Sequence, residues 1–172
     1  MSQHPLVQYL DSVPDFPKPG VVFSDISPLL KSHFNETIDA MSALFSEEEW
    51  AQIDYLAGIE SRGFIFASAL AYKHNKGVVK VRKSGKLPNV HSSVDYDLEY
   101  GTDCLEMQQG DDRKVVLFDD LIATGGSMGA AAELCEKVGY NLFGMACLID
   151  LASLNSFQYN DMKVRSVIQF KD

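Results

Sequence analysis

The chain has 172 residues, 46% of them hydrophobic, and a formal net charge of -9. This length suits one α/β domain with its own core. The negative charge argues against a nucleic-acid-binding protein, because DNA and RNA are held by an excess of lysine and arginine. The sequence has no apolar run long enough to cross a bilayer, and its start, MSQHPLVQYLDS, lacks an export signal. We therefore expect a cytoplasmic protein that binds no membrane.

The cysteines and histidines give no sign of a disulfide framework or a metal site. Cys104, Cys135 and Cys147 are odd in number and lack C-x-x-C spacing, which predicts reduced, buried thiols. The four histidines also lack the spacing of metal ligands. We therefore expect each histidine to be a solvated or packed residue and not a metal ligand.

Apolar segments with strand and helix patterns alternate along the chain, beginning with a short buried strand. The predicted strands are residues 54–59, 77–82, 114–119 and 141–149; the predicted helices run from Ser61 to about Asn75, and from the turn at 124–127 to about Val138. Strands separated by helices require crossover connections. The pattern therefore predicts a mainly parallel sheet flanked by helices, with ligands bound beyond the carboxyl ends of its strands.

One basic cluster stands out in this acidic chain. Lys80, Arg82, Lys83 and Lys86 lie within seven residues of each other. Such a cluster is able to hold a small polyanion, although a solvated surface turn is the commoner role of a charge run.

The segment VVLFDDLIATGGS (residues 115–127) joins an apolar strand to a helix through two acids and a glycine turn. Gly125 and Gly126 let the backbone approach a ligand closely, and the helix N-terminus that follows favours a phosphate group. Asp119 and Asp120 would repel that phosphate, so we expect them to accept hydrogen bonds from a sugar diol. A ligand-free tight turn is the alternative interpretation.

This segment resembles the 5-phosphoribosyl-1-pyrophosphate (PRPP) motif of type I phosphoribosyltransferases, in which an apolar strand and two acids precede A-T-G-G-[ST]. The resemblance implies that Asp119 and Asp120 bind the ribose hydroxyls. It also implies a 5-phosphate site formed by Ala123, Thr124, Gly125, Gly126 and Ser127.

A second segment, PDFPKPGVVFSDISPLL (residues 14–30), is similar to the base-binding segment of the adenine phosphoribosyltransferase family. The resemblance implies that the backbone at Val22 and the ring of Phe23 contact adenine. Members usually carry Arg where this chain has Ser24, so base specificity could differ. Without the resemblance, a packed apolar segment is the plainer interpretation.

Two further segments resemble the pyrophosphate-binding parts of the same family. GIESRGFIF (residues 58–66) implies roles for Ser61 and Arg62, and Arg suits forked phosphate contacts. The plainer alternative makes Ser61 a helix cap and Arg62 a surface charge. VRKSGKLP (residues 81–88) contains most of the basic cluster, and it implies pyrophosphate ligands at Arg82, Lys83 and Lys86.

The segment VDYDLEYGTDCLE (residues 94–106) resembles the family's mobile catalytic hairpin. The resemblance implies that Glu99 manages the proton on the base and that Tyr100 supports the flap. The stretch 107–113 that follows is shorter than the family norm, and Asp103 receives no role. A solvent-exposed hairpin without a catalytic function is the alternative.

Together these resemblances identify the chain as a member of the adenine phosphoribosyltransferase family and imply the type I phosphoribosyltransferase fold. We expect one domain over residues 1–172, with a hood at about 1–35, a core at about 50–170 and a mobile flap at about 90–108. The implied reaction joins adenine to PRPP, giving AMP and pyrophosphate in purine salvage, and the implied assembly is a homodimer. The implied cofactor is Mg²⁺, held mainly by substrate and water with no direct protein ligands. The alternatives are an enzyme for a 6-oxopurine and a regulator that senses the sugar phosphate without catalysis.

Overall fold

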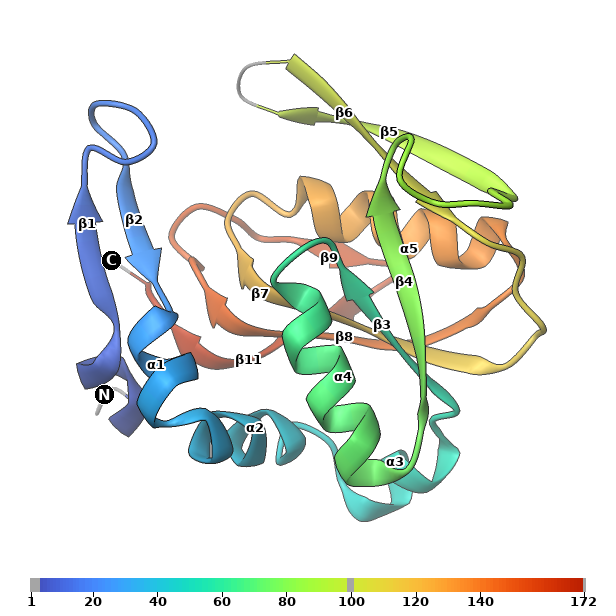
Figure 1. The fold of residues 1–172 in the computed structure, drawn as a ribbon, viewed down its shortest axis with the longest axis horizontal. Helices are drawn as coiled ribbons and strands as arrows, with labels where there is room; N and C mark the ends of the chain where they lie inside the picture. The colour runs from blue at the N-terminus through green and yellow to red at the C-terminus, as the bar shows by residue number, and fades with distance from the viewer. Residues whose placement is uncertain (1–3, 99–100, 172) are drawn as a thin grey trace.

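The computed structural model describes residues 4–98 and 101–171, and within them a seven-stranded sheet forms the centre of the molecule (Figure 1). The strand order is β11-β8-β7-β3-β4-β6-β5. The strands are β3 (Tyr55–Ile59), β4 (Gly77–Lys83), β5 (Ser92–Leu98), β6 (Gly101–Met107), β7 (Lys114–Ile122), β8 (Asn141–Asp150) and β11 (Arg165–Gln169).

The pairing within this sheet confirms the prediction of a mainly parallel α/β fold. Strands β11, β8, β7, β3 and β4 pair in parallel, and β6 and β5 add an antiparallel hairpin beside β4. The four predicted strands are present, and β7 continues to Ile122, beyond its predicted end at residue 119. The hairpin expected at residues 90–108 is therefore joined to the central sheet through the antiparallel pairing of β4 with β6.

The helices lie on both faces of the sheet. The structure contains α1 (Ser27–Ser32), α2 (Phe34–Ser42), α3 (Glu47–Gln52), α4 (Gly63–His74) and α5 (Gly126–Lys137). Helix α4 begins two residues later than predicted. It ends at His74, because the next residue, Asn75, has a left-handed φ of 53° that stops the helix. Helix α5 begins inside the predicted turn, so Gly126 and Ser127 already belong to its first turn.

Successive side chains of the central strands point to opposite faces of the sheet, so the core consists of two layers. Leu56 and Phe118 pack on the face covered by α2 and α4, together with Phe66. Their neighbours Ala57 and Leu117 pack on the opposite face, with the apolar side of α5. Parallel strands buried on both faces read as continuous apolar runs, which is why these strands were predictable from the sequence.

A short antiparallel ribbon lies near the start of the chain, before the first predicted strand. After a 3₁₀ turn, η1 (Pro5–Tyr9), strands β1 (Asp11–Pro14) and β2 (Val22–Asp25) form a two-stranded antiparallel ribbon, separate from the central sheet. A second small ribbon joins β9 (Gln158–Tyr159) to β10 (Met162–Lys163). Within the described part of the chain, no helix is long and apolar enough to cross a membrane.

Candidate active site

A cavity of about 780 Å³ opens at the carboxyl ends of β3 and β7. The ribbon β1–β2 and the hairpin β5–β6 contribute to its walls from opposite sides. The sequence-predicted site residues that line it are Val22, Phe23, Ser24, Ser61, Arg62, Lys83, Asp119, Asp120, Ala123, Thr124, Gly125, Gly126 and Ser127. The fold therefore brings four separate motif segments to one place, as parallel topology predicts.

Among the described residues, two predicted site residues are not among those lining the cavity. Arg82 and Lys86 point their charged groups at Glu60, which does line it. Glu99 and Tyr100 lie outside the described residues, so their roles stay predictions. The lining residues that sequence reasoning missed include Gly20, Glu60, Asp97, Leu98, Met128, Leu151 and Leu154.

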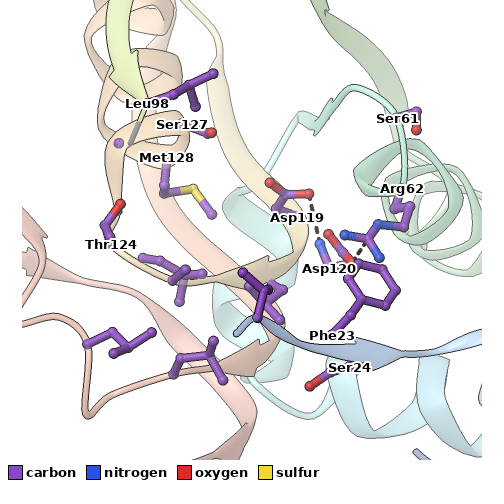
Figure 2. Close-up of a pocket in the computed structure, with 18 of the residues that line it drawn as sticks. Phe23, Ser24, Ser61, Arg62, Leu98, Asp119, Asp120, Thr124, Ser127 and Met128 are labelled. Atoms are coloured by element: carbon purple, nitrogen blue, oxygen red, sulfur yellow. Dashed lines mark hydrogen bonds and ion pairs between the residues drawn. The ribbon is translucent and has the colours of Figure 1, made fainter. Parts of the chain in front are cut away.

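The turn between β7 and α5 has the form expected of an anion site. Gly125 adopts a φ of 94°, which L residues rarely reach, and α5 starts at the next residue. The first turn of a helix leaves backbone N–H groups unpaired and carries a partial positive charge. Thr124 and Ser127 lie at this end of the cavity (Figure 2). The turn is therefore equipped to bind a phosphate.

The hairpin β5–β6 lies close over this turn. A Cβ atom built on Gly126 would lie 3.4 Å from the backbone oxygen of Asp97. Leu98, the last residue of β5, lies beside Ser127 and Met128 (Figure 2). The hairpin therefore forms part of the wall around any group bound at the turn.

Two acids at the end of β7 lie between the turn and the opposite wall of the cavity (Figure 2). Asp119 Oδ1 accepts a hydrogen bond of 2.9 Å from the backbone N–H of Asp120. Asp120 Oδ2 lies 2.9 Å from Arg62 Nε in an ion pair, yet this buried oxygen accepts no hydrogen bond from the described residues. It therefore has acceptor capacity left for a ligand.

Burial and like charge act together on Asp119. Desolvation raises the pKa of the Asp119 carboxyl well above its usual value, and the adjacent charge of Asp120 raises it further. A buried acid with a raised pKa in a cavity is typical of a functional site, because folding alone gains nothing from it. This is the strongest electrostatic sign that the acids serve a ligand.

Close packing of α4 on β7 positions Arg62. A Cβ atom on Gly63 would lie only 2.6 Å from the carbonyl oxygen of Phe118, so this contact requires glycine. Arg62 immediately precedes the helix, and its guanidinium lies 5.0 Å above the centre of the Phe23 ring. The same group also pairs with Asp120. Arg62 thus links the predicted base-binding ring to the predicted ribose-binding acids.

Glu60 organises the basic segment. It accepts hydrogen bonds from Lys86 Nζ at 2.8 Å, from the backbone N–H of Lys83 at 2.9 Å and from Arg82 Nε at 3.2 Å. Burial opposes its ionisation, but these three bonds lower the pKa of Glu60 to about 2. The parallel pairing of Ile59 with Val81 sets Glu60 beside Arg82. A register between strands distant in sequence is not visible in a sequence motif.

A second acid holds the lysine that lines the cavity. Lys83 Nζ lies 2.9 Å from Asp103 Oδ2 on β6, and the Tyr96 hydroxyl donates to the same carboxylate at 3.2 Å. The hydrogen bond from Lys83 lowers the pKa of Asp103. Asp103, which received no role from the sequence, therefore joins the hairpin to the basic segment.

The cysteines differ from the prediction at one position. Cys135 and Cys147 are buried as expected, and burial raises the pKa of both thiols. Cys104, on β6, is only partly buried. Across residues 4–98 and 101–171, no group of three or more His, Cys, Asp or Glu side chains is placed to hold a metal ion.

Comparison with known proteins defines the class first. The model of the phosphoribosyl transferase domain family matches residues 30–171. That range includes the acids, the glycine turn, the basic segment and the described part of the hairpin. The chain therefore belongs to the phosphoribosyltransferase family.

Individual relatives narrow the class. An adenine phosphoribosyltransferase of Hydrogenovibrio crunogenus is 70% identical over 172 residues, which cover all of both chains. The crystal structure of the adenine phosphoribosyltransferase of Rhodothermus marinus has a TM-score of 0.85 at 39% identity and covers 96% of each chain. The enzyme of Saccharomyces cerevisiae, solved with an imino-altritol bisphosphate and adenine, has a TM-score of 0.84 at 35% identity, covering 95% of this chain and 96% of that one. Within its family, the chain belongs with the adenine phosphoribosyltransferases.

Proposed function

We propose that the protein transfers the 5-phosphoribosyl group of PRPP to adenine, giving AMP and pyrophosphate in purine salvage. The observation that carries this proposal is the single cavity in which a helix N-terminus, two acids, an aromatic ring and a basic residue meet. Each of these groups suits a different part of the two substrates. The 70% identical relative is an adenine phosphoribosyltransferase, in agreement with the proposal.

The 5-phosphate and the ribose take the side of the cavity nearest α5. The phosphate accepts hydrogen bonds from the turn formed by Ala123–Ser127, where the helix dipole favours negative charge. The ribose hydroxyls donate to Asp119 and Asp120. The unused acceptor capacity of Asp120 Oδ2 supports this assignment.

The base binds at the opposite side of the cavity, against the ring of Phe23. An aromatic face suits a purine, and Val22 and Ser24 flank this ring on the same strand. The Arg62 guanidinium lies over the Phe23 ring. Arg62 therefore moves from the ring when the purine stacks there, and its charge becomes available to the substrates.

Pyrophosphate binds between the start of α4 and the basic segment. Ser61, Arg62 and Lys83 line this part of the cavity. Arg82 and Lys86 complete the positive charge when the pyrophosphate competes with Glu60 for them, and Glu60 keeps their side chains in place until then. An anion with several charges is a stronger competitor than one carboxylate.

The reaction is a displacement at the anomeric carbon, through a transition state with oxocarbenium character. The cavity holds the two substrates in line and surrounds them with fixed charges, which supplies much of the rate. Glu99 manages the proton on the base, and Tyr100 supports the hairpin as it closes the site from water.

The donor set is consistent with Mg²⁺. Asp119 and Asp120 offer carboxylate oxygens, the ligand type that Mg²⁺ prefers, and they accept hydrogen bonds from metal-bound water equally well. We propose that substrate oxygens and water hold the ion, without direct protein ligands. When bound, Mg²⁺ supplies positive charge that neutralises the pyrophosphate leaving group.

The remaining assignments rest on the resemblance and on composition. We propose that residues 1–172 form one domain, with the hood at about 1–35, the core at about 50–170 and the flap at about 90–108. A homodimer is implied by the resemblance, and light scattering coupled to gel filtration tests it. A cytoplasmic location is supported by the three unpaired cysteines.

A panel of bases tests the proposal. Purified protein with PRPP and Mg²⁺ is assayed in parallel with adenine, hypoxanthine, guanine and xanthine, and nucleotide formation is measured. We expect a strong preference for adenine, with Ser24 as a tolerated change. Preference for a 6-oxopurine would overturn the substrate assignment. Binding of PRPP without turnover of any base would favour a regulator.

A further inference from the structure

The loop that follows β8, residues 151–157, lies behind the turn assigned to the 5-phosphate. Asn155 is half-buried in this loop, and its Nδ2 group donates to the backbone oxygen of Ala123 at 2.8 Å. The same amide donates to the backbone oxygen of Leu151 at 3.0 Å and to Asp150 Oδ1 at 3.1 Å. Its Oδ1 accepts from the backbone N–H of Phe157 at 3.1 Å. One side chain therefore ties the end of β8, its own loop and the turn together.

Phe157 fills the space behind the glycines of the same turn. A Cβ atom on Gly125 would lie 2.6 Å from the Phe157 ring, and one on Gly129 would lie 3.2 Å from it. The ring therefore packs directly against the backbone of the turn and of the first part of α5. Because Asn155 fixes the backbone of Phe157, the amide and the ring act on the turn as one unit.

The contact between Asn155 and Ala123 orients a peptide plane. The carbonyl group of Ala123 and the N–H group of Thr124 belong to one planar peptide and point in opposite directions. When Asn155 holds the carbonyl, the Thr124 N–H points away from Asn155. A glycine turn without this restraint has many backbone conformations, and ordering them on ligand binding costs free energy.

We propose that Asn155 is a positioning residue that holds the Ala123–Ser127 turn in the conformation that binds the 5-phosphate of PRPP. The inference rests on the proposed function of that turn. Asn155 contacts the turn from behind, through a backbone oxygen, and it acts on the substrate only through the turn. Its loss should therefore weaken phosphate binding more than base binding or turnover.

Two substitutions remove the restraint in different ways. Asn155→Ala deletes the amide, whereas Asn155→Asp keeps its size and the acceptor for Phe157 but loses the donor to Ala123. Asn141→Ala is the matched control, because Asn141 also donates to a backbone oxygen, that of Asp112, outside the residues that line the cavity. Should Asn155→Ala not fold, Asn155→Asp decides the question.

The readouts are the Kd of ribose 5-phosphate from calorimetry, the KM values for PRPP and adenine, and kcat. For both Asn155 variants we expect the Kd of ribose 5-phosphate and the KM for PRPP to rise about five- to tenfold, the loss typical of one hydrogen bond. The KM for adenine and kcat should stay within about twofold of the original protein, and Asn141→Ala should change none of these values. A KM for PRPP within twofold of the original would overturn the inference. The inference would also fail if the KM for adenine rose, or kcat fell, by the same factor as the KM for PRPP rose.

A substitution within the turn separates this inference from the proposed function. Thr124→Val removes a hydroxyl from the turn itself and should weaken ribose 5-phosphate binding. If Thr124→Val weakens that binding and the Asn155 variants do not, the positioning role is wrong and the phosphate site stands. If the original protein does not bind ribose 5-phosphate, or Thr124→Val binds it equally well, the assigned phosphate site is wrong and the inference fails with it.

Discussion

Gly125→Ala tests the packing of the Ala123–Ser127 turn most sharply, because the added methyl group lowers the unfolding free energy for two separate reasons. The backbone φ of 94° lies in the region that favours glycine, and the new Cβ atom would lie 2.6 Å from the ring of Phe157. An L residue held in the left-handed region costs about 1–2 kcal/mol. Overpacking against a ring costs roughly 1–3 kcal/mol more.

The two costs add to about 2–5 kcal/mol of lost unfolding free energy. For a chain of this size, each kcal/mol lowers the melting temperature by roughly 2–4 °C. We therefore expect Gly125→Ala to melt roughly 4–20 °C below the original protein, and to bind PRPP weakly because the turn must move.

Gly139→Ala is the matched control for the backbone cost. Its φ is 97°, almost that of Gly125, but nothing lies within 4 Å of its added Cβ atom. Urea unfolding should give a loss of about 1–2 kcal/mol there. In the double variant Gly125→Ala, Phe157→Ala, the clash is gone. Its loss of unfolding free energy should therefore be about 1–3 kcal/mol smaller than the sum of the losses in the two single variants. The account is refuted if Gly125→Ala costs no more than Gly139→Ala, or if the double variant is additive.

Three substitutions test charged groups, two of them at the site and one away from it. Asp119→Asn should reduce turnover roughly 100-fold yet raise the melting temperature at pH 8 by about 2–4 °C, because burial and then the neighbouring charge raise the pKa of Asp119. This gain in melting temperature should vanish below pH 3.8, where the Asp119 carboxyl is protonated in the folded and unfolded states alike. If Asp119→Asn melts below the original protein at pH 8, the reasoning is contradicted. Glu60→Gln should lower the unfolding free energy at pH 7. Burial opposes ionisation of Glu60, but hydrogen bonds, foremost that from Lys86, hold its pKa at about 2. In urea unfolding, the original protein should therefore lose this stabilisation as pH falls from 4.5 through about 2, and the variant should not. Arg165→Ala breaks a two-pronged ion pair with Glu49 and should cost about 1–2 kcal/mol of unfolding free energy, with KM values unchanged in the base assay; a changed KM would show an unforeseen link to the site.

The sheet and the turn at its edge could be predicted because their causes are local in sequence. Strand β7 is buried on both faces, so it reads as an apolar run, and the two acids near its end lie only a few residues before the two glycines of the turn. The helix after Gly125 was also visible, although its start was misplaced because Gly126 and Ser127 read as turn residues. The side chains that we assign to the ribose and the backbone turn that we assign to the 5-phosphate both lie within residues 115–127.

The missed features have no local pattern in the sequence, and two of them depend on contacts between distant segments. Strands β1 and β2 are short, mostly exposed and paired only with each other, so no buried pattern marks them. The pairing of Glu60 with Arg82 depends on the register of β3 and β4. Asn155 lies 32 positions from Ala123, and its sequence neighbourhood gives no sign of this contact.

A crystal structure with AMP bound tests the central claim that this cavity is where the nucleotide forms. We predict the phosphate at Thr124–Ser127, the ribose hydroxyls on Asp119 and Asp120, and the purine on the ring of Phe23, with Arg62 moved off that ring. AMP bound elsewhere, or bound with its phosphate at the basic segment and its purine at the glycine turn, would contradict the account.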